Sequence, residues 1–287
     1  METIIGRTAP GAKVGEGPIW SARDGCLYWV DILGNALHAY YLQSGSTRTW
    51  SFRQHVCWII EREKGGFILG LADGIYTLRL EPFAMTHLAT LFPAESQNRL
   101  NDAKADNLGR IWAGSTHMPQ TEKSGAFYRL NTDLTTVEVD GPYQIANGPT
   151  FSADHRKVYH TDSAESDVFV FDLIDGELAN KRRFVHFQWD WGAPDGMTTD
   201  AQGGIWIAHW GGGRISRFTE SGELDFDIPI PARQVTSLCF AGNDLDRLFV
   251  TTAALDQPSD RLAGTLFEVT GDALRGHTGL PTQNFKG

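Results

Sequence analysis

A two-strand motif recurs six times along the chain, and this repeat constrains the fold more than any other feature of the sequence. Each copy has a turn rich in Gly, Asp and Asn, a short apolar strand, a second turn and a second strand. Aligned on one residue of each first strand, the copies are 40, 44, 47, 47 and 43 residues apart. The aligned residues are Tyr28, Ile68, Trp112, Tyr159, Trp206 and Phe249. Such a period without helical segments is typical of β-propeller blades.

The expected strands leave little sequence outside the repeat. First strands are expected at 27–31, 67–71, 111–115, 158–162, 205–209 and 248–252. Their hairpin partners are expected at 35–40, 74–78, 125–130, 167–171, 214–218 and 265–269. Leucine-rich repeats are shorter, helical repeats need a 3.6-residue period, and the single Trp189-Asp190 pair disfavours WD40 blades. We therefore predict an all-β fold in which residues 1–287 form one six-bladed β-propeller domain.

A further strand is expected upstream of each first strand, and its beginning carries the candidate site. Eleven or twelve residues before the aligned positions stand Glu16, Cys57, Asn101, Asn147, Asp195 and Ser237. Equivalent positions in a propeller surround its axis at one height, so two carboxylates and two amides should converge there. Asn and Asp also favour turns, but Glu has no such preference. Clustered carboxylates need a neutralising cation, and oxygen ligands suit Ca²⁺, Mg²⁺ or Mn²⁺.

The charge and composition of the chain exclude some classes of binding partner. The chain has 25 Lys and Arg against 35 Asp and Glu, giving a net charge of −10, which disfavours nucleic acid and anionic membrane surfaces as partners. No apolar run is long enough to cross a bilayer, and the first residues show no signal-peptide pattern. Its three cysteines have no CxxC spacing and are expected to be reduced. A cytoplasmic protein is therefore expected, and the sequence does not indicate its oligomeric state.

Four motifs carry a family resemblance that extends from about residue 12 to residue 270. The motifs are Gly15-Glu16-Gly17-Pro18, Asn98-Arg99-Leu100-Asn101-Asp102, Asn147-Gly148-Pro149 and Pro194-Asp195-Gly196. In this order they resemble the senescence-marker-protein/gluconolactonase/regucalcin-like family, and bacterial sugar-acid lactonases in particular. The resemblance implies a six-bladed propeller with one catalytic divalent metal cation. It implies that Glu16, Asn147 and Asp195 are the metal ligands.

The same resemblance implies the substrate contacts and the reaction. Arg99 and Asn101 correspond to substrate-binding residues, and Glu122 is similar to a further family contact that precedes the segment 125–128. The implied activity is the opening of an aldono-1,4- or 1,5-lactone, such as glucono-, arabinono- or xylonolactone, to its sugar acid. Asp195 is the expected proton acceptor for the attacking water. The cation is Ca²⁺, Zn²⁺, Mn²⁺, Mg²⁺ or Fe²⁺, and the sequence does not distinguish among them.

Two other functions are compatible with an acidic centre of this kind. One is a metal-dependent esterase or phosphotriesterase-type hydrolase on the same scaffold, and the other is a non-catalytic calcium-binding propeller. Arg99, Asn101 and Glu122 favour a polyhydroxylated substrate, and therefore a lactone. The sequence contains no GxSxG, P-loop, HExxH or GxGxxG motif, which excludes several other enzyme classes.

Overall fold

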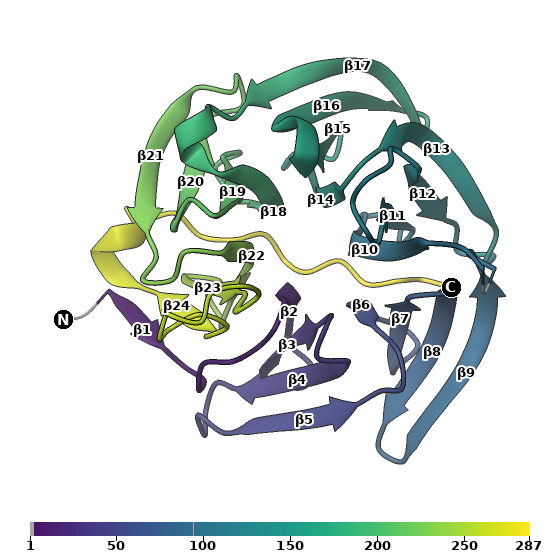
Figure 1. Cartoon of the computed structure of the whole chain (residues 1–287), viewed down its shortest axis with the longest axis horizontal. Coiled ribbons are helices and arrows are strands. Elements are labelled where there is room, and N and C mark those ends of the chain that lie inside the picture. The colour runs from purple at the N-terminus through teal and green to yellow at the C-terminus, as the bar shows by residue number, and fades with distance from the viewer. Residues whose placement is uncertain (1–2, 94) are drawn as a thin grey trace.

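Six four-stranded antiparallel sheets surround a common axis in the computed structural model, which describes residues 3–93 and 95–287 (Figure 1). The innermost strands are β2 (Gly15–Ser21), β6 (Val56–Glu61), β10 (Asn98–Ala105), β14 (Ala146–Phe151), β18 (Ala193–Thr199) and β22 (Val235–Ala241). The second strands are β3 (Cys26–Asp31), β7 (Phe67–Leu71), β11 (Ile111–His117), β15 (Lys157–Asp162), β19 (Ile205–Trp210) and β23 (Arg247–Thr252). We number the blades 1 to 6 in this order.

The outer strands complete the blades. The third strands are β4 (Ala36–Tyr41), β8 (Gly74–Leu80), β12 (Gly125–Leu130), β16 (Asp167–Ile174), β20 (Arg214–Phe218) and β24 (Phe267–Val269). The outermost strands are β5 (Thr47–Ser51), β9 (Phe83–Thr90), β13 (Thr136–Tyr143), β17 (Glu177–His186), β21 (Leu224–Pro229) and β1 (Ile4–Gly6). Short 3₁₀ turns are η1 (Ser163–Glu165), η2 (Trp189–Trp191) and η3 (Gly271–Leu274). The predicted all-β, six-bladed propeller is confirmed.

Blade 6 is built from both ends of the chain. Strand β1 pairs antiparallel with β24, with Ile4 opposite Val269 and Gly6 opposite Phe267. Strand β24 is shorter than the predicted span 265–269, because the Thr265 amide donates to the Leu262 carbonyl and the Leu266 amide donates to Thr8 Oγ1. These two residues therefore end a turn rather than begin the strand. Closure of the ring through β1 ties the N-terminal strand to the last blade.

In blades 3 and 5, a buried aspartate that follows the innermost strand accepts a hydrogen bond from a tryptophan of the second strand. Trp112 Nε1 donates to Asp106 at 2.8 Å, and Trp206 Nε1 donates to Asp200 at 2.7 Å. Arg217 Nε adds a second bond to Asp200 at 2.6 Å. These contacts satisfy the indole N–H groups at the centre of the blade core, where an unpaired donor would be costly. No helix among the described residues is long and apolar enough to span a membrane.

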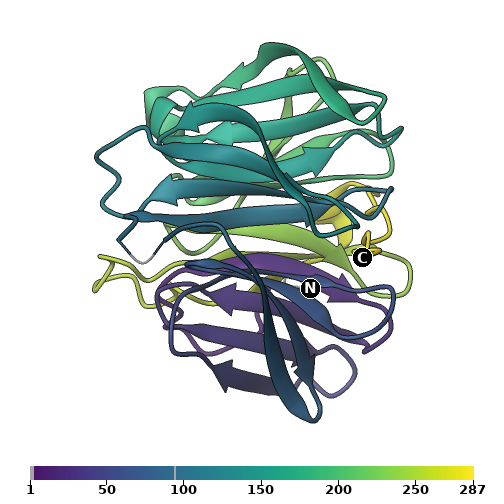
Figure 2. The same ribbon diagram turned by 90° about the vertical axis from the view of Figure 1, so that its right-hand side faces the viewer.

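The last residues of the chain cross one face of the ring, from blades 5 and 6 to blades 2 and 3 (Figure 1). The Ala201 amide donates to the Thr278 carbonyl at the start of the crossing, and the Lys286 amide donates to the Gly109 carbonyl at its end. The side view shows the C terminus toward one of the two faces of the ring (Figure 2). Phe285 is fully buried among apolar residues of blades 2 and 3. The segment therefore covers one mouth of the axis.

Replacing Phe285 with Ala is expected to destabilise the protein by about 3–5 kcal/mol, because it empties a filled core position. The Phe285 amide donates to the Glu61 carbonyl at 2.8 Å, so the backbone holds the cavity open rather than letting it collapse. Urea unfolding would measure the loss, with Leu108→Ala at a 55% exposed position as the control. A change no larger than that of the control would contradict a core role for Phe285.

Candidate active site

Each innermost strand bulges at the position where the sequence places a site residue. Register shifts follow Glu16 in β2, Leu100 in β10, Asn147 in β14 and Pro194 in β18. A β-bulge re-aims side chains and interrupts strand pairing. Gly17 has φ +51° and Gly148 has φ +72°, a backbone conformation that favours glycine. The Gly-containing motifs therefore shape the backbone that presents the site residues to the axis.

Glu16 and Asp195 meet at the axis. Both side chains are buried, at 5% and 3% exposure, and they lie close enough for the charge of one to act on the other. Burial, then the charges of Asp195 and Asp102, raises the pKa of Glu16 well above its ordinary value. Burial and the charge of Asp102 likewise raise the pKa of Asp195. Two carboxylates in this position need a shared proton or a cation.

Asp102 adds a third buried carboxyl group, which the sequence pattern left outside the candidate ligands. It follows Asn101 in β10, and its Oδ1 accepts a 2.7 Å bond from the Ala103 amide. Burial raises the pKa of Asp102 to about 7, although the nearby charge of Lys104 lowers it. The centre is therefore more acidic than the sequence predicted.

A chain of polar contacts joins blades 3, 4 and 5 beside the carboxylates. Arg99 Nη1 donates to Asn101 Oδ1 at 2.7 Å, and Asn101 Nδ2 donates to Asn147 Oδ1 at 2.6 Å. Asn147 Nδ2 donates to Ser163 Oγ at 2.9 Å, and Ser163 donates to the Pro194 carbonyl at 2.6 Å. Asn147 Oδ1 keeps a second lone pair. Sequence reasoning missed Ser163, which stands in η1 outside the innermost strands.

Glu122 stands on a loop outside the innermost strands. It is exposed in the loop between β11 and β12, where its amide donates to His117 Nδ1 at 3.2 Å. Among the described residues, no side-chain hydrogen bond or ion pair connects its carboxylate to the acidic centre. The structure thus brings together Glu16, Arg99, Asn101, Asn147 and Asp195, and the substrate contact of Glu122 stays a prediction.

Three histidines near the ends of second strands have structural surroundings. His117 bonds Gln97 and the amides of the loop that follows it. His160 packs against Phe127 with 3.9 Å between ring centroids, and burial lowers its pKa to about 3. His209 bonds the Trp191 carbonyl at 2.9 Å, and burial lowers its pKa to about 4. His117 and His209 therefore anchor loops, whereas His160 is held by packing alone, with both ring nitrogens buried without a hydrogen-bond partner.

The donor set at the axis fits a hard divalent cation. Asp195 Oδ1 is buried and has no hydrogen-bond partner, while Glu16 and Asn147 present further oxygens. In residues 3–93 and 95–287, no cluster of three His, Cys, Asp or Glu side chains has the arrangement of a metal site. The candidate set differs from such a cluster because one of its three members is an amide. Oxygen-only donors of this kind match Ca²⁺, Mg²⁺ or Mn²⁺ chemistry.

Fold and site together define a six-bladed propeller with a buried acidic centre on its axis. The chain belongs to the SMP-30/Gluconolactonase/LRE-like region family, whose model matches residues 14–254. The resemblance seen in the four motifs is therefore confirmed.

Individual relatives cover most of the chain. It is 35% identical over 263 residues to a pentonolactonase of Haloferax volcanii, covering 91% of this chain and 88% of the relative. It is 32% identical over 252 residues to a 6-deoxy-6-sulfogluconolactonase of Pseudomonas putida, covering 87% of each. The solved structure of a luciferin-regenerating enzyme superposes with a TM-score of 0.92, at 28% identity and 99% coverage of both chains.

Proposed function

We propose that the protein is a metal-dependent lactonase that hydrolyses a sugar lactone to the corresponding sugar acid. The observation that carries this proposal is the burial of the Glu16 and Asp195 carboxyl groups near each other, together with the Arg99–Asn101 hydrogen bond. The relatives named pentonolactonase and 6-deoxy-6-sulfogluconolactonase support an aldonolactone as the substrate class. An aldono-1,4- or 1,5-lactone fits the proposal.

Glu16, Asn147 and Asp195 would hold the cation in this proposal. When bound, a divalent cation polarises the lactone carbonyl and stabilises negative charge on its oxygen. The oxygen donors favour Ca²⁺, Mg²⁺ or Mn²⁺, and Zn²⁺ and Fe²⁺ remain candidates for the experiment to compare. The hydrogen bonds to Asn101 and Ser163 hold the Asn147 amide in one orientation, and its Oδ1 keeps a lone pair that could bind the cation.

Asp195 acts as the proton acceptor for the attacking water. A carboxylate has two oxygens, so in this proposal one oxygen of Asp195 would contact the cation while the other accepts the proton. Water adds to the carbonyl carbon as Asp195 removes its proton, and the bond between that carbon and the ring oxygen then breaks. The leaving alkoxide recovers the proton and becomes a hydroxyl group, and the product is the open-chain acid. Positioned proton transfer contributes about 10²–10⁴-fold to rates.

Arg99 and Asn101 orient the ring. Arg99 Nη1 donates hydrogen bonds to Asn101 Oδ1 and to the Leu100 carbonyl. The other N–H groups of the guanidinium would donate to hydroxyl groups of the lactone. The charge of Arg99 also favours the carboxylate product. Glu122, on its exposed loop, would accept a hydrogen bond from a hydroxyl group farther from the reacting carbon.

A panel of substrates tests the proposal. The protein is stripped with a chelator, resupplied separately with Ca²⁺, Mg²⁺, Mn²⁺, Zn²⁺ or Fe²⁺, and assayed for acid release from aldonolactones with a pH indicator. We expect cation-restored hydrolysis of pentono- or hexonolactones above the spontaneous rate. Preferential cleavage of an aryl ester or a phosphotriester would contradict the lactonase proposal and identify an esterase or phosphotriesterase-type hydrolase. Cation binding without hydrolysis of any of them would identify a non-catalytic propeller.

A further inference from the structure

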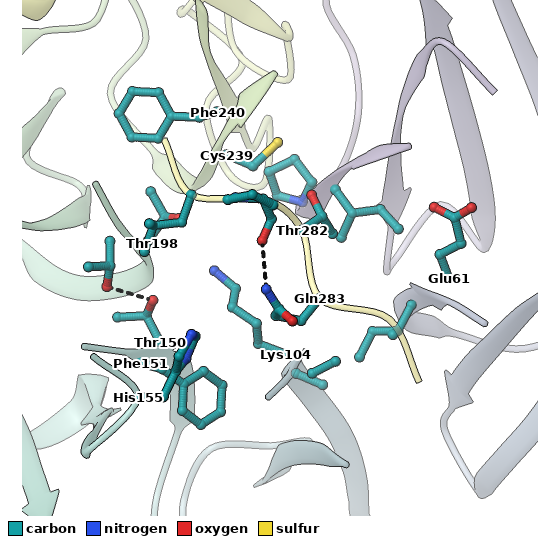
Figure 3. A pocket seen from close by; sticks show the side chains of 18 residues that line it. Glu61, Lys104, Thr150, Phe151, His155, Thr198, Cys239, Phe240, Thr282 and Gln283 are labelled. Carbon is teal, nitrogen blue, oxygen red and sulfur yellow. Dashed lines mark hydrogen bonds between the residues drawn. The ribbon is translucent and has the colours of Figure 1, made fainter. Parts of the chain in front are cut away.

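Lys104 occupies the axis of the propeller beyond the acidic centre. It stands on β10 two residues after Asp102, and its side chain lines a cavity of about 100 Å³ that the C-terminal segment covers. Figure 3 shows this side chain reaching between Thr198 of blade 5 and Gln283 of the C-terminal segment. Neither the proposed mechanism nor the packing of the blades uses this lysine.

The Lys104 ammonium group makes a hydrogen bond between two blades that are not neighbours. Its Nζ donates to the carbonyl oxygen of Met197 at 2.7 Å, which joins β10 of blade 3 to β18 of blade 5. Blade 4 lies between these two blades (Figure 1). Elsewhere in the described part of the chain, side-chain hydrogen bonds between blades connect neighbours, as Asn101 with Asn147 and Thr150 with Thr199 do. Lys104 therefore joins two blades that are not neighbours in the ring.

The two ends of this tie lie just beyond the two bulges that shape the site. In β10, the register shifts between Leu100 and Ala103, and in β18 it shifts between Pro194 and Met197. A bulge interrupts the ladder of strand hydrogen bonds, so the ladder alone holds bulged residues less firmly. The Lys104 bond is placed to fix the separation of the two bulges across the axis.

Charge favours a lysine at this position. The Lys104 ammonium and the Asp102 carboxylate attract each other, and this attraction opposes the effect that burial has on the pKa of each group. Three buried carboxyl groups, Glu16, Asp102 and Asp195, lie at the same end of the channel. Arg99 and Lys104 both place positive charge near these carboxyl groups, Arg99 near Glu16 and Lys104 near Asp102.

We propose that Lys104 is a positioning residue that holds Asp195 on β18 at a fixed distance from Arg99 and Asn101 on β10. The proposal rests on the lactonase function proposed above, because it assigns the proton acceptor to one strand and the ring contacts to the other. Lys104 touches neither substrate nor cation. Its effect on the reaction passes through the backbone of β18.

Lys104→Met tests this hydrogen bond, because Met keeps an unbranched chain as far as Cε and removes the donor and the charge. Misplacement of a reacting group by about 1 Å can cost about 10²-fold in rate. We therefore expect kcat to fall by about 10- to 100-fold, with KM changed by less than about threefold because Arg99 and Asn101 stay in place. Lys104→Arg keeps the donors and the charge and should restore most of kcat. Lys64→Met, on an exposed turn, is the matched control.

Hydrogen–deuterium exchange gives a readout that is independent of turnover. In Lys104→Met we expect faster exchange of the amides in 193–199 than in the wild type, with 15–21 of blade 1 unchanged and Lys104→Arg close to wild type. Unchanged exchange in β18, unchanged kcat, or failure of Lys104→Arg to restore both would overturn the proposal. In another outcome, the wild type hydrolyses no lactone while exchange in β18 still rises in Lys104→Met. That result would support the structural role of the Lys104 bond and refute only its role in catalysis, together with the proposed function.

Discussion

Asp195→Asn is expected to lower kcat for lactone hydrolysis by roughly 10³-fold or more, because the change removes the proton acceptor and weakens the cation site together. The amide has nearly the shape of the carboxylate, so the buried position stays filled and the fold is retained. Steady-state hydrolysis at saturating cation measures the rate, and calorimetric titration of the chelated protein measures cation affinity. A variant with near wild-type kcat would contradict the assignment of Asp195.

Two comparison variants separate this effect from general damage. Asp190→Asn makes the same chemical change on an exposed residue of η2, five positions away, and should leave both rate and cation affinity near wild type. Arg99→Ala removes a proposed ring contact and should raise KM while leaving cation affinity largely unchanged. Loss of cation binding in Arg99→Ala would show that Arg99 supports the cation centre instead.

Removal of the cation is expected to make folding stability strongly dependent on pH. Burial raises the pKa values of Glu16, Asp102 and Asp195 in the folded protein, so the native state binds more protons than the unfolded state. The chelated protein should therefore lose stability as pH rises above about 4, through the raised folded-state pKa values. The value of about 7 for Asp102 places part of this loss near neutrality.

A bound cation reverses this trend, because it favours the ionised carboxylates. At about 100 times its dissociation constant, a ligand specific to the native state adds about 2.7 kcal/mol of stability. We expect the cation-induced rise in Tm to be several degrees larger at about pH 8 than at about pH 5. Thermal unfolding with and without chelator measures this difference, and Glu16→Gln/Asp195→Asn should abolish it. A cation effect that is equal at both pH values would contradict a site built from these carboxylates.

The three inner strands of each blade could be predicted from the sequence, and the outermost strand could not. The second and third strands are apolar and bounded by Gly, Asp or Asn, so their positions and the register of Glu16, Asn101, Asn147 and Asp195 follow from the repeat. Outermost strands such as β9 are mostly exposed and lack that pattern. Their formation depends on pairing with a strand already in place.

Long-range contacts account for the parts of the site that the sequence did not reveal. Pairing of β1 with β24 joins residues more than 200 positions apart, and the C-terminal segment bonds to blades far from it in the sequence, contacts for which the repeat gives no signal. Lys104 follows a bulge, which changes the face that later residues of β10 present to the axis. Ser163 acts from η1, just beyond a second strand.

The central claim is that one divalent cation, held by Glu16, Asn147 and Asp195, is required for lactone hydrolysis. Its most direct test is the initial rate of acid release from an aldonolactone as cation is added stepwise to the chelated protein. We expect a rate near the spontaneous one without cation and a rise that ends at one cation per chain, whereas the rate of Asp195→Asn should not rise at any cation concentration. Full activity in the chelated protein would contradict it.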